Sequence, residues 1–183
     1  MIEPATGILL ISDPFLKDPN FKRTVVLLCE HKEEGSFGLV LNRTFDHTLD
    51  ELITELEGYV VPVYYGGPVQ MDTLHFLHQL PDEIPGGQEI TNGIYWGGNF
   101  ESVVSGLKNG TLDLTKIRFY LGYSGWSSGQ LSEEMNVKSW LTVSATKTLI
   151  FNTETDAIWK DAIKSMGGQY EQIIHYPIDP QLN

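Results

Sequence analysis

The sequence predicts an α+β fold: a single domain over residues 1–183 whose mixed, mainly antiparallel β-sheet, open or barrel-like, is flanked by about four helices. Three observations lead to this prediction. Most strand-like runs follow one another without an intervening helix, which favours antiparallel pairing over a doubly wound sheet. No proline- or serine-rich linker and no repeat divides the chain. At 183 residues, the chain can also bury about 70% of its unfolded surface in one core.

The first three strands are expected at residues 7–12, 24–31 and 37–42. The second run is apolar almost throughout, so both of its faces should be buried in the middle of the sheet. Glu34-Gly35-Ser36 supplies the short link of a hairpin, and the second and third strands should therefore be antiparallel.

A helix should follow, because Thr48 and Glu51 form a capping box and Gly58 can end the helix. Its apolar stripe has four members: Leu49, Leu52, Ile53 and Leu56. Residues 59–65 and 74–80 are expected to be strands, and Pro62 places the first of them at an edge or a bulge.

The middle of the chain carries the strongest hairpin pattern, residues 88–91 and 94–97 joined by Asn92-Gly93. Asn99 should then cap a short helix that ends at Gly110, a residue suited to left-handed backbone. The buried stripe of this helix is Phe100, Val103, Val104 and Leu107. Residues 118–122 should return as a strand.

The C-terminal third begins with a second candidate capping box, Ser127 and Gln130, for a helix that continues through Met135. Residues 140–145 and 149–151 are expected to form a final strand pair.

A last helix should begin with Thr153 or Thr155 as its cap and end at Gly167-Gly168. Four of its residues share one apolar face: Trp159, Ala162, Ile163 and Met166. That face should pack on the core.

The charge of the chain argues against a nucleic-acid partner. It has 24 acidic and 12 basic residues, a net charge of -12 and no cluster of Lys and Arg to neutralise phosphates. The single cysteine cannot form an internal disulfide, the N-terminus lacks a signal-peptide pattern, and no apolar run approaches the ~20 residues that cross a bilayer. We therefore expect a cytoplasmic protein without a membrane partner.

Several dispersed segments, in this order, resemble the YqgE/AlgH family of bacterial proteins. They are Gly7-Ile-Leu-Leu-Ile11, Asp18-Pro19, Arg23-Thr-Val-Val26, Gly35-Ser-Phe-Gly38, Leu39-Val-Leu-Asn-Arg43, Tyr65-Gly-Gly-Pro-Val69, Tyr95-Trp-Gly-Gly98, Gly122-Tyr-Ser-Gly-Trp126, Gly129-Gln-Leu131, Trp140 and Trp159. The resemblance implies a single α+β domain in the bacterial cytoplasm, with no established reaction and no catalytic set. Some family members are labelled regulators of alginate synthesis or of transcription. The sequence has no recognisable helix-turn-helix.

The segment Gly122-Tyr-Ser-Gly-Trp126 leaves a strand and approaches a helix, as the nucleophile elbow of hydrolases does. The last glycine of that motif is replaced by Trp126, and no parallel βαβ series surrounds it. A tight glycine turn that buries the Trp126 ring is therefore favoured over a catalytic Ser124.

The same turn could instead hold a carboxylate or phosphate on free backbone N–H groups at the helix start. The candidate ligand-binding residues are Arg23, Asn42, Arg43, Tyr123, Ser124, Trp126, Ser127 and Gln130. Arg23 or Arg43 would supply the countercharge. The structural alternatives are an Arg23–Asp18 pair and strand-end hydrogen bonds from Asn42 and Arg43.

Cys29 is a candidate reactive thiol, because His31 lies two residues away on the same strand face and an imidazolium lowers the pKa of a thiol. The alternative is an inert core cysteine at the end of an apolar run. His75 and His78 fall on opposite faces of a strand and carry no metal motif, so neither a metal nor another cofactor is expected.

The chain also has a dense aromatic set, for which core packing is favoured over a stacking platform. The set is Tyr59, Tyr64, Tyr65, Tyr95, Trp96, Tyr120, Tyr123 and Trp126. The leading hypothesis is a non-enzymatic binding or regulatory protein that acts through an unknown protein partner or a small anionic ligand at residues 122–130. The alternatives are a transcriptional regulator, which would need a basic face, and a cryptic hydrolase or thiol enzyme built on Ser124 or Cys29.

Overall fold

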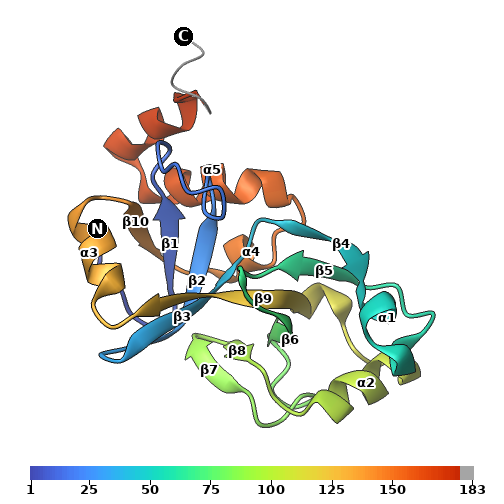
Figure 1. The fold of residues 1–183 in the computed structure, drawn as a ribbon. Coiled ribbons are helices and arrows are strands. Elements are labelled where there is room, and N and C mark those ends of the chain that lie inside the picture. Colours follow the sequence, from blue (N-terminus) through green and yellow to red (C-terminus); the bar gives the residue numbers. More distant parts are fainter. Residues whose placement is uncertain (178–183) are drawn as a thin grey trace.

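The computed structural model describes residues 1–177, and residues 178–183 of the predicted domain lie outside that part (Figure 1). Ten strands form one curled, mainly antiparallel sheet. The strands are β1 Ile8–Ser12, β2 Val25–Lys32, β3 Gly35–Val40, β4 Thr44–Thr48, β5 Pro62–Tyr65, β6 Val69–His78, β7 Gln88–Thr91, β8 Ile94–Trp96, β9 Ile117–Ser127 and β10 Trp140–Ser144. The α+β prediction is confirmed, and the sheet has the barrel-like curl that the sequence left open.

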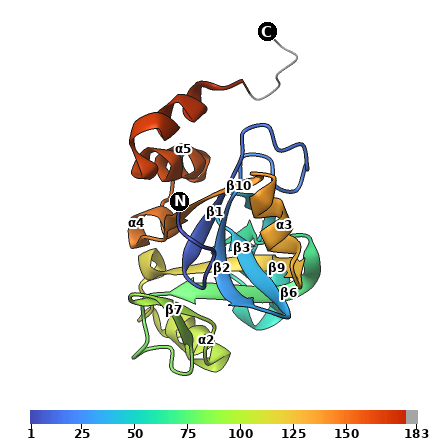
Figure 2. The same ribbon diagram turned by 90° about the vertical axis from the view of Figure 1, so that its left-hand side faces the viewer.

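Five α-helices and three 3-10 helices cover the sheet within residues 1–177. They are α1 Leu49–Leu52, η1 Thr54–Leu56, α2 Phe100–Asn109, η2 Leu114–Lys116, α3 Gln130–Asn136, α4 Lys147–Ile150, α5 Thr155–Met166 and η3 Gly168–His175. The views agree that α5 and α2 lie at opposite ends of the molecule, with α3 beside the far end of β9 (Figures 1 and 2). None of the helices in this part of the chain is long and apolar enough to cross a bilayer.

Strand β9 is the centre of the sheet, since it pairs antiparallel with β3 and β6 and parallel with β5. Its side chains alternate between separate apolar clusters. Tyr120 packs in the cluster that contains α5, whereas Phe119 and Leu121 pack in the cluster that contains α2. Towards its end, Trp126 packs beside α3. One strand therefore contributes to three parts of the core.

The N-terminal strands follow the sequence pattern. Residues 25–29 of β2 are fully buried, and β2 lies between β1 and β3 and is antiparallel to both. The hairpin β7–β8 also forms around Asn92-Gly93 as predicted. Asn99 caps α2 by accepting a 3.0 Å hydrogen bond from the Ser102 N–H, and Gly110 has a φ of 67° after its end.

The helix predicted after Thr48 is broken. Its first turn ends at Ile53, which is extended with φ -127° and ψ 109°, and a separate 3-10 turn follows. Thr48 does not cap; its Oγ1 donates to Asp50 Oδ1 at 2.6 Å. The physical reason is tertiary, because β4 pairs with β5 and the Leu49 N–H donates to the Val61 carbonyl at 2.9 Å.

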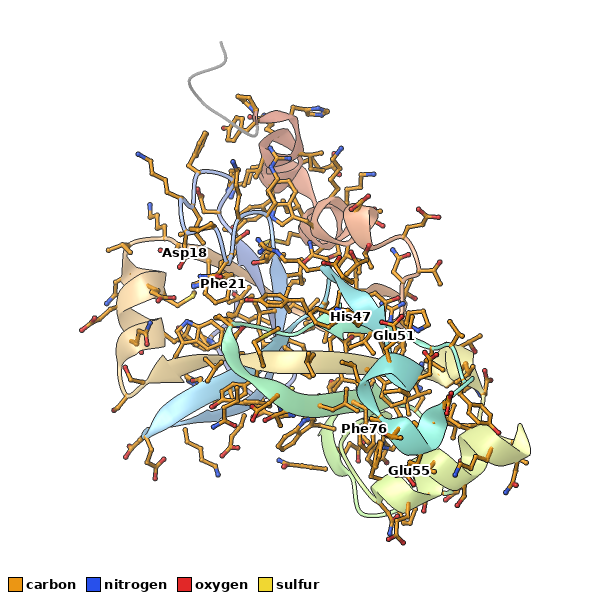
Figure 3. The ribbon with its side chains drawn as sticks, turned by 45° about the vertical axis from the view of Figure 1, so that its right-hand side comes forward. Asp18, Phe21, His47, Glu51, Glu55 and Phe76 are labelled. Carbon is orange, nitrogen blue, oxygen red and sulfur yellow. The ribbon has the colours of Figure 1, made fainter. Side chains whose placement is uncertain are left out.

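The sequence pattern also missed β4 itself, the strand that leads into this turn. On the outer side of α1, His47 and Glu51 face each other, with Nδ1 and Oε2 2.7 Å apart (Figure 3). This pair replaces the predicted bond from Glu51 to the cap.

The predicted strand at residues 149–151 is wrong, because residues 147–150 form α4. Thr146 accepts a 3.2 Å hydrogen bond from the Leu149 N–H and starts that helix. An apolar run this short has no period that separates a helix from a strand. Strand β10 pairs instead with β1.

Helix α5 ends before Gly167 and buries Trp159, Ala162 and Ile163, as predicted. Its predicted caps are wrong: Glu154 occupies the N-cap position without a side-chain hydrogen bond. The start of the helix is held by Asn152, whose Oδ1 accepts from the Glu154 N–H at 2.9 Å.

Candidate functional site

The glycine-rich segment that was predicted to be a turn is part of β9, which continues to Ser127. Gly122 has a φ of 70° where the pairing of β9 with β6 shifts its register. Ser124 is fully buried, and its Oγ donates to the Gly66 carbonyl at 3.2 Å. The segment is therefore no nucleophile elbow, and Ser124 holds two strands together.

The predicted capping box of α3 is half formed. Gln130 Oε1 accepts from the Ser127 N–H at 3.0 Å, but Ser127 is the last residue of β9. Gly129 occupies the N-cap position with a φ of 78° and no side chain to cap with. A helix of seven residues that begins in this way offers little to an anion.

The predicted countercharges are engaged elsewhere. Arg23 lies over the Trp159 ring at 4.6 Å and donates to the Tyr176 carbonyl, and no ion pair joins it to Asp18 in the part of the chain described. Arg43 donates to the carbonyls of Pro19 and Lys22. Asn42 accepts from the Val25 N–H and donates to the Arg23 carbonyl, which ties the loop to the strand end.

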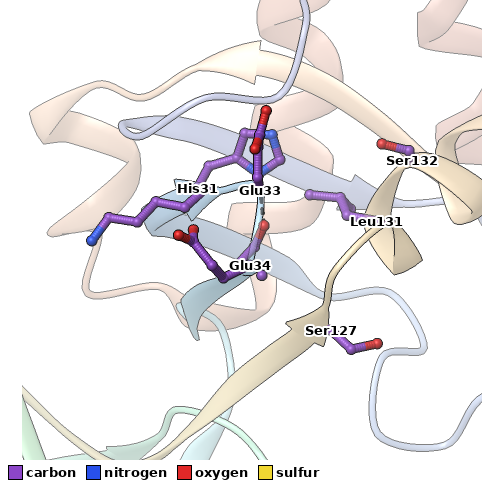
Figure 4. A pocket seen from close by; sticks show the side chains of 10 residues that line it. His31, Glu33, Glu34, Ser127, Leu131 and Ser132 are labelled. Atoms are coloured by element: carbon purple, nitrogen blue, oxygen red, sulfur yellow. Dashed lines mark hydrogen bonds between the residues drawn. The ribbon is translucent and has the colours of Figure 1, made fainter.

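The hollow beside Ser127 has a volume of about 690 Å³ and lies between the β2–β3 hairpin and the start of α3 (Figure 4). Glu33 and Glu34 line it, and its one lysine, Lys32, pairs with Glu30. His31 Nδ1 lies 2.6 Å from Ser36 Oγ across the hairpin. Two free carboxylates make this hollow a poor place for an anion.

The predicted ligand-binding residues therefore do not converge. Tyr123 and Trp126 line a neighbouring, more apolar hollow, and Ser127 lines both hollows. Neither Arg23 nor Arg43 lines either one. An anion site at residues 122–130 would have no arginine beside it.

Arg118, unlike Arg23 and Arg43, is buried beside a cavity. Its side chain is 7% exposed in β9, and no carboxylate of residues 1–177 comes within 4.0 Å of it. Its guanidinium carbon lies 4.5 Å from the centre of the Tyr64 ring, and Nη1 donates to the Ile150 carbonyl at 3.1 Å. A buried arginine without an acidic partner is rare, because desolvation of its charge is costly.

Arg118 lines a cavity of about 260 Å³, partly open to solvent, between the starts of β5 and β9 and the α4–α5 connection. The other lining residues are Val61, Pro62, Tyr64, Leu114, Thr115, Ile117, Phe151 and Thr153. Arg118 is the only charged residue among them. We call this space the Arg118 cavity.

A second polar group next to Arg118 is unsatisfied. The Tyr120 hydroxyl is buried and has no hydrogen-bond partner in the described residues. Burial raises the pKa of Tyr120, and the positive charge of Arg118 partly opposes that rise. The hydroxyl therefore stays protonated as a potential donor.

Sequence reasoning placed Arg118 in a strand but not in a site. The available signal was its position, one charged residue inside the apolar run Ile117-Arg-Phe-Tyr-Leu121. In a central strand with both faces covered, an arginine has little contact with water. Such a residue indicates a site that uses a positive charge.

A sequence model described as AlgH-like matches residues 9–171, which include Arg118 and every residue that lines its cavity. The chain belongs to the AlgH-like family. UPF0301 proteins of Chlorobium limicola and Bacteroides fragilis are similar to it, with 42% and 40% identity over 97% and 100% of the chain and 95% and 93% of the relative.

Solved AlgH-like structures share the fold. The AlgH protein of Pseudomonas aeruginosa, known in solution, has a TM-score of 0.75 and 28% identity over 97% of this chain and 98% of its own. A Corynebacterium diphtheriae protein has a crystal structure with a TM-score of 0.81 over 96% of this chain and 94% of its own. At 22% identity, the latter similarity concerns the fold alone.

Within this AlgH-like fold, Cys29 does not have the setting of a reactive thiol. It is fully buried, it lies at a bulge of β2 where the pairing skips a residue, and burial raises its pKa well above 9.0. His31 hydrogen bonds to Ser36 rather than to the thiol. The inert-core alternative fits these observations.

The raised pKa of Cys29 predicts a pH effect on stability. Below pH 9 the thiol is protonated in both states; above it only the unfolded state releases the proton, so folding is weakened as pH rises. Between pH 8 and pH 10, the unfolding free energy of the parent protein should fall by about 1.4 kcal/mol relative to that of Cys29→Ala, which has no thiol to ionise. Urea unfolding at both pH values measures it. A difference that does not change with pH would contradict the buried, protonated thiol.

His75 and His78 lie on β6 and do not approach a common ligand. His75 packs against Phe37 and Trp96, and its Nε2 has no hydrogen-bond partner within residues 1–177, while burial lowers its pKa. His78 Nε2 lies 2.8 Å from the Gly97 carbonyl. No group of three or more potential metal ligands gathers within the described residues.

Proposed function

We propose that this AlgH-like protein is a binding protein for a small organic anion, which Arg118 recognises. The supporting observation is the burial of the Arg118 guanidinium beside a cavity without any carboxylate partner. The proposal keeps the small-anion hypothesis drawn from the sequence and moves its site from residues 122–130 to the opposite end of β9.

Burial of a guanidinium is costly, because the charged group loses its hydration. Coulombic attraction to an anion offsets the desolvation of a guanidinium, and a carboxylate can accept two parallel N–H bonds from its planar fork. Within residues 1–177, Nη1 donates to the Ile150 carbonyl. The proposed ligand would accept hydrogen bonds from the other guanidinium N–H groups.

The lining of the cavity narrows the ligand class to carboxylates. Tyr64, Phe151 and Ile117 surround the guanidinium with apolar surface, which suits a charged head joined to a carbon skeleton. A fully hydrated inorganic phosphate would lose its water against these walls without equivalent polar contacts. A volume of about 260 Å³ also limits the part of the ligand inside the cavity to a small fragment.

The proposal predicts the behaviour of two Arg118 variants. Arg118→Met keeps the apolar stem but removes the charge, so hexanoate and benzoate should bind at least tenfold more weakly by titration calorimetry. Arg118→Lys should bind with intermediate affinity, because the ammonium keeps the charge but loses the fork. Inorganic phosphate should bind more weakly than either carboxylate.

The matched control is Lys116→Met, which removes the same charge from an exposed residue of η2 close to the cavity. It should leave carboxylate affinity within about twofold. Thermal unfolding of each variant separates loss of binding from loss of folding. The proposal fails if neither carboxylate binds the parent protein, or if Arg118→Met binds both as tightly as the parent does.

A further inference from the structure

We infer that the anion held by Arg118 is an aliphatic carboxylate whose chain leaves the Arg118 cavity and lies in a second, adjoining hollow. This inference rests on the proposed function and specifies its ligand. The observations that carry it are the two lining residues that the spaces share, their lack of acidic residues and the exposed apolar side chains at their edges.

The second hollow has a volume of about 380 Å³ and lies between the segment that enters β5 and the end of α2. Its lining residues are Gly58, Tyr59, Val60, Val61, Gly106, Leu107, Gly110, Leu112 and Leu114. None of them carries a charge. We call this space the apolar hollow.

Val61 and Leu114 line both spaces, so the apolar hollow adjoins the Arg118 cavity at these two side chains. A ligand whose head meets Arg118 would pass Leu114 to reach the apolar hollow. It would run from the one guanidinium to a region lined by aliphatic side chains, Tyr59 and glycine backbone. Such polarity, charged at one end and apolar along the rest, matches a carboxylate on an aliphatic chain.

The charge of the whole chain makes this lining informative. The protein has 24 acidic residues and a net charge of -12, yet no carboxylate lines either space. The hollow between the hairpin and α3 shows the contrast, because Glu33 and Glu34 line it. A carboxylate ligand would be repelled at the latter place and attracted at Arg118.

Exposed apolar side chains mark the junction and the rim. Val60 is 71% exposed and Leu114 is 49% exposed within the part of the chain that the structure describes. Isolated exposed side chains are ordinary, but these two belong to one continuous apolar lining. A ligand chain in the apolar hollow would cover part of both.

A homologous series of carboxylates tests the inference. Butyrate, hexanoate and octanoate share one head and differ in chain length, so their affinities should rise by up to about fourfold for each added methylene. Titration calorimetry on the whole protein measures them. Octanol, which has the octanoate chain without the charge, should bind at least tenfold more weakly than octanoate.

A matched pair of variants locates the chain. Val60→Asp places a negative charge in the apolar hollow but not in the Arg118 cavity, because Val60 lines only the former. Octanoate affinity should therefore fall by at least tenfold, and butyrate affinity should change much less. Leu52→Asp is the control, because Leu52 is also exposed and apolar, at 38%, and lines neither space. It should leave the whole series unchanged.

The outcomes separate this inference from the proposed function. Equal affinities for the three carboxylates, all lost in Arg118→Met, would overturn the aliphatic chain and leave the anion site standing. A chain-length dependence that survives in Val60→Asp would also overturn it, since the chain would lie elsewhere. If no carboxylate binds the parent protein, the proposed function fails and the inference fails with it.

Discussion

Gly67→Ala is expected to cost more than about 4 kcal/mol of unfolding free energy, enough to prevent folding of an ordinary domain. Gly67 has a φ of 153°, a conformation open almost only to glycine. A Cβ added there would overlap the backbone of Tyr123 and Ser124 in β9. Because both partners are backbone, no side-chain rotation can relieve the overlap.

The control for Gly67→Ala is Gly110→Ala. Gly110 also has a positive φ, 67°, but a Cβ there would meet nothing within 4 Å. Gly110→Ala should therefore lower the unfolding free energy by about 1 to 2 kcal/mol, the strain of an alanine in the left-handed conformation. Urea unfolding measures Gly110→Ala, and soluble yield with circular dichroism measures Gly67→Ala if it does not fold. Equal costs for the two variants would show that the close approach of Gly67 to β9 contributes nothing.

This close approach explains why β9 could not be delimited from the sequence. Residues 122–125 are glycine-rich, and in isolation such a run is typical of a turn. In the fold, Gly66 and Gly67 lie against this segment, the Gly66 carbonyl accepts from Ser124 Oγ, and β3 pairs with it. The glycines of β9 serve strand packing, and their partners are more than 50 residues away, as with Gly66 and Ser124.

Elements whose signals are local were predicted well. The Asn92-Gly93 hairpin and the Asn99-capped helix are each fixed by residues within a few positions of one another. The prediction of a continuous helix after Thr48 was wrong, because the Leu49 N–H donates to the Val61 carbonyl, twelve residues along the chain. Local chemistry thus predicted the elements whose hydrogen bonds are local and missed those whose partners are distant.

The candidate site depended on distant contacts even more strongly. Arg23 and Arg43 were selected as countercharges because arginine suits anions, but the fold uses them to hold carbonyl groups of neighbouring loops and the C-terminal segment. Arg118 differs only in what surrounds it, namely Tyr64, Ile150 and a cavity. Those neighbours come from separate segments, so composition and motif could not identify them.

Glu134→Leu should have the second large effect, a loss of about 3 kcal/mol or more of unfolding free energy. Glu134 Oε2 accepts from the indole N–H groups of Trp126 at 2.9 Å and Trp140 at 2.7 Å, and Oε1 accepts from Gln130 Nε2 at 3.1 Å. The two tryptophans are 4% and 1% exposed. Leucine would leave two buried N–H donors without an acceptor, and each such donor costs about 1 to 3 kcal/mol.

The position of Glu134 makes this loss more than a local one. Trp126 lies near the end of the central strand β9 and Trp140 begins the edge strand β10, so one carboxylate on α3 connects the middle of the curled sheet to its edge. Glu134→Gln keeps an amide oxygen in the same place and should lose about half as much unfolding free energy as Glu134→Leu. Glu133→Leu changes the exposed neighbour on the same helix and should stay within about 0.5 kcal/mol of the parent. Urea unfolding followed by tryptophan fluorescence measures all three variants. A Glu134→Leu variant as stable as Glu133→Leu would mean that the indole N–H groups find other partners, and that α3 does not hold the two strands together.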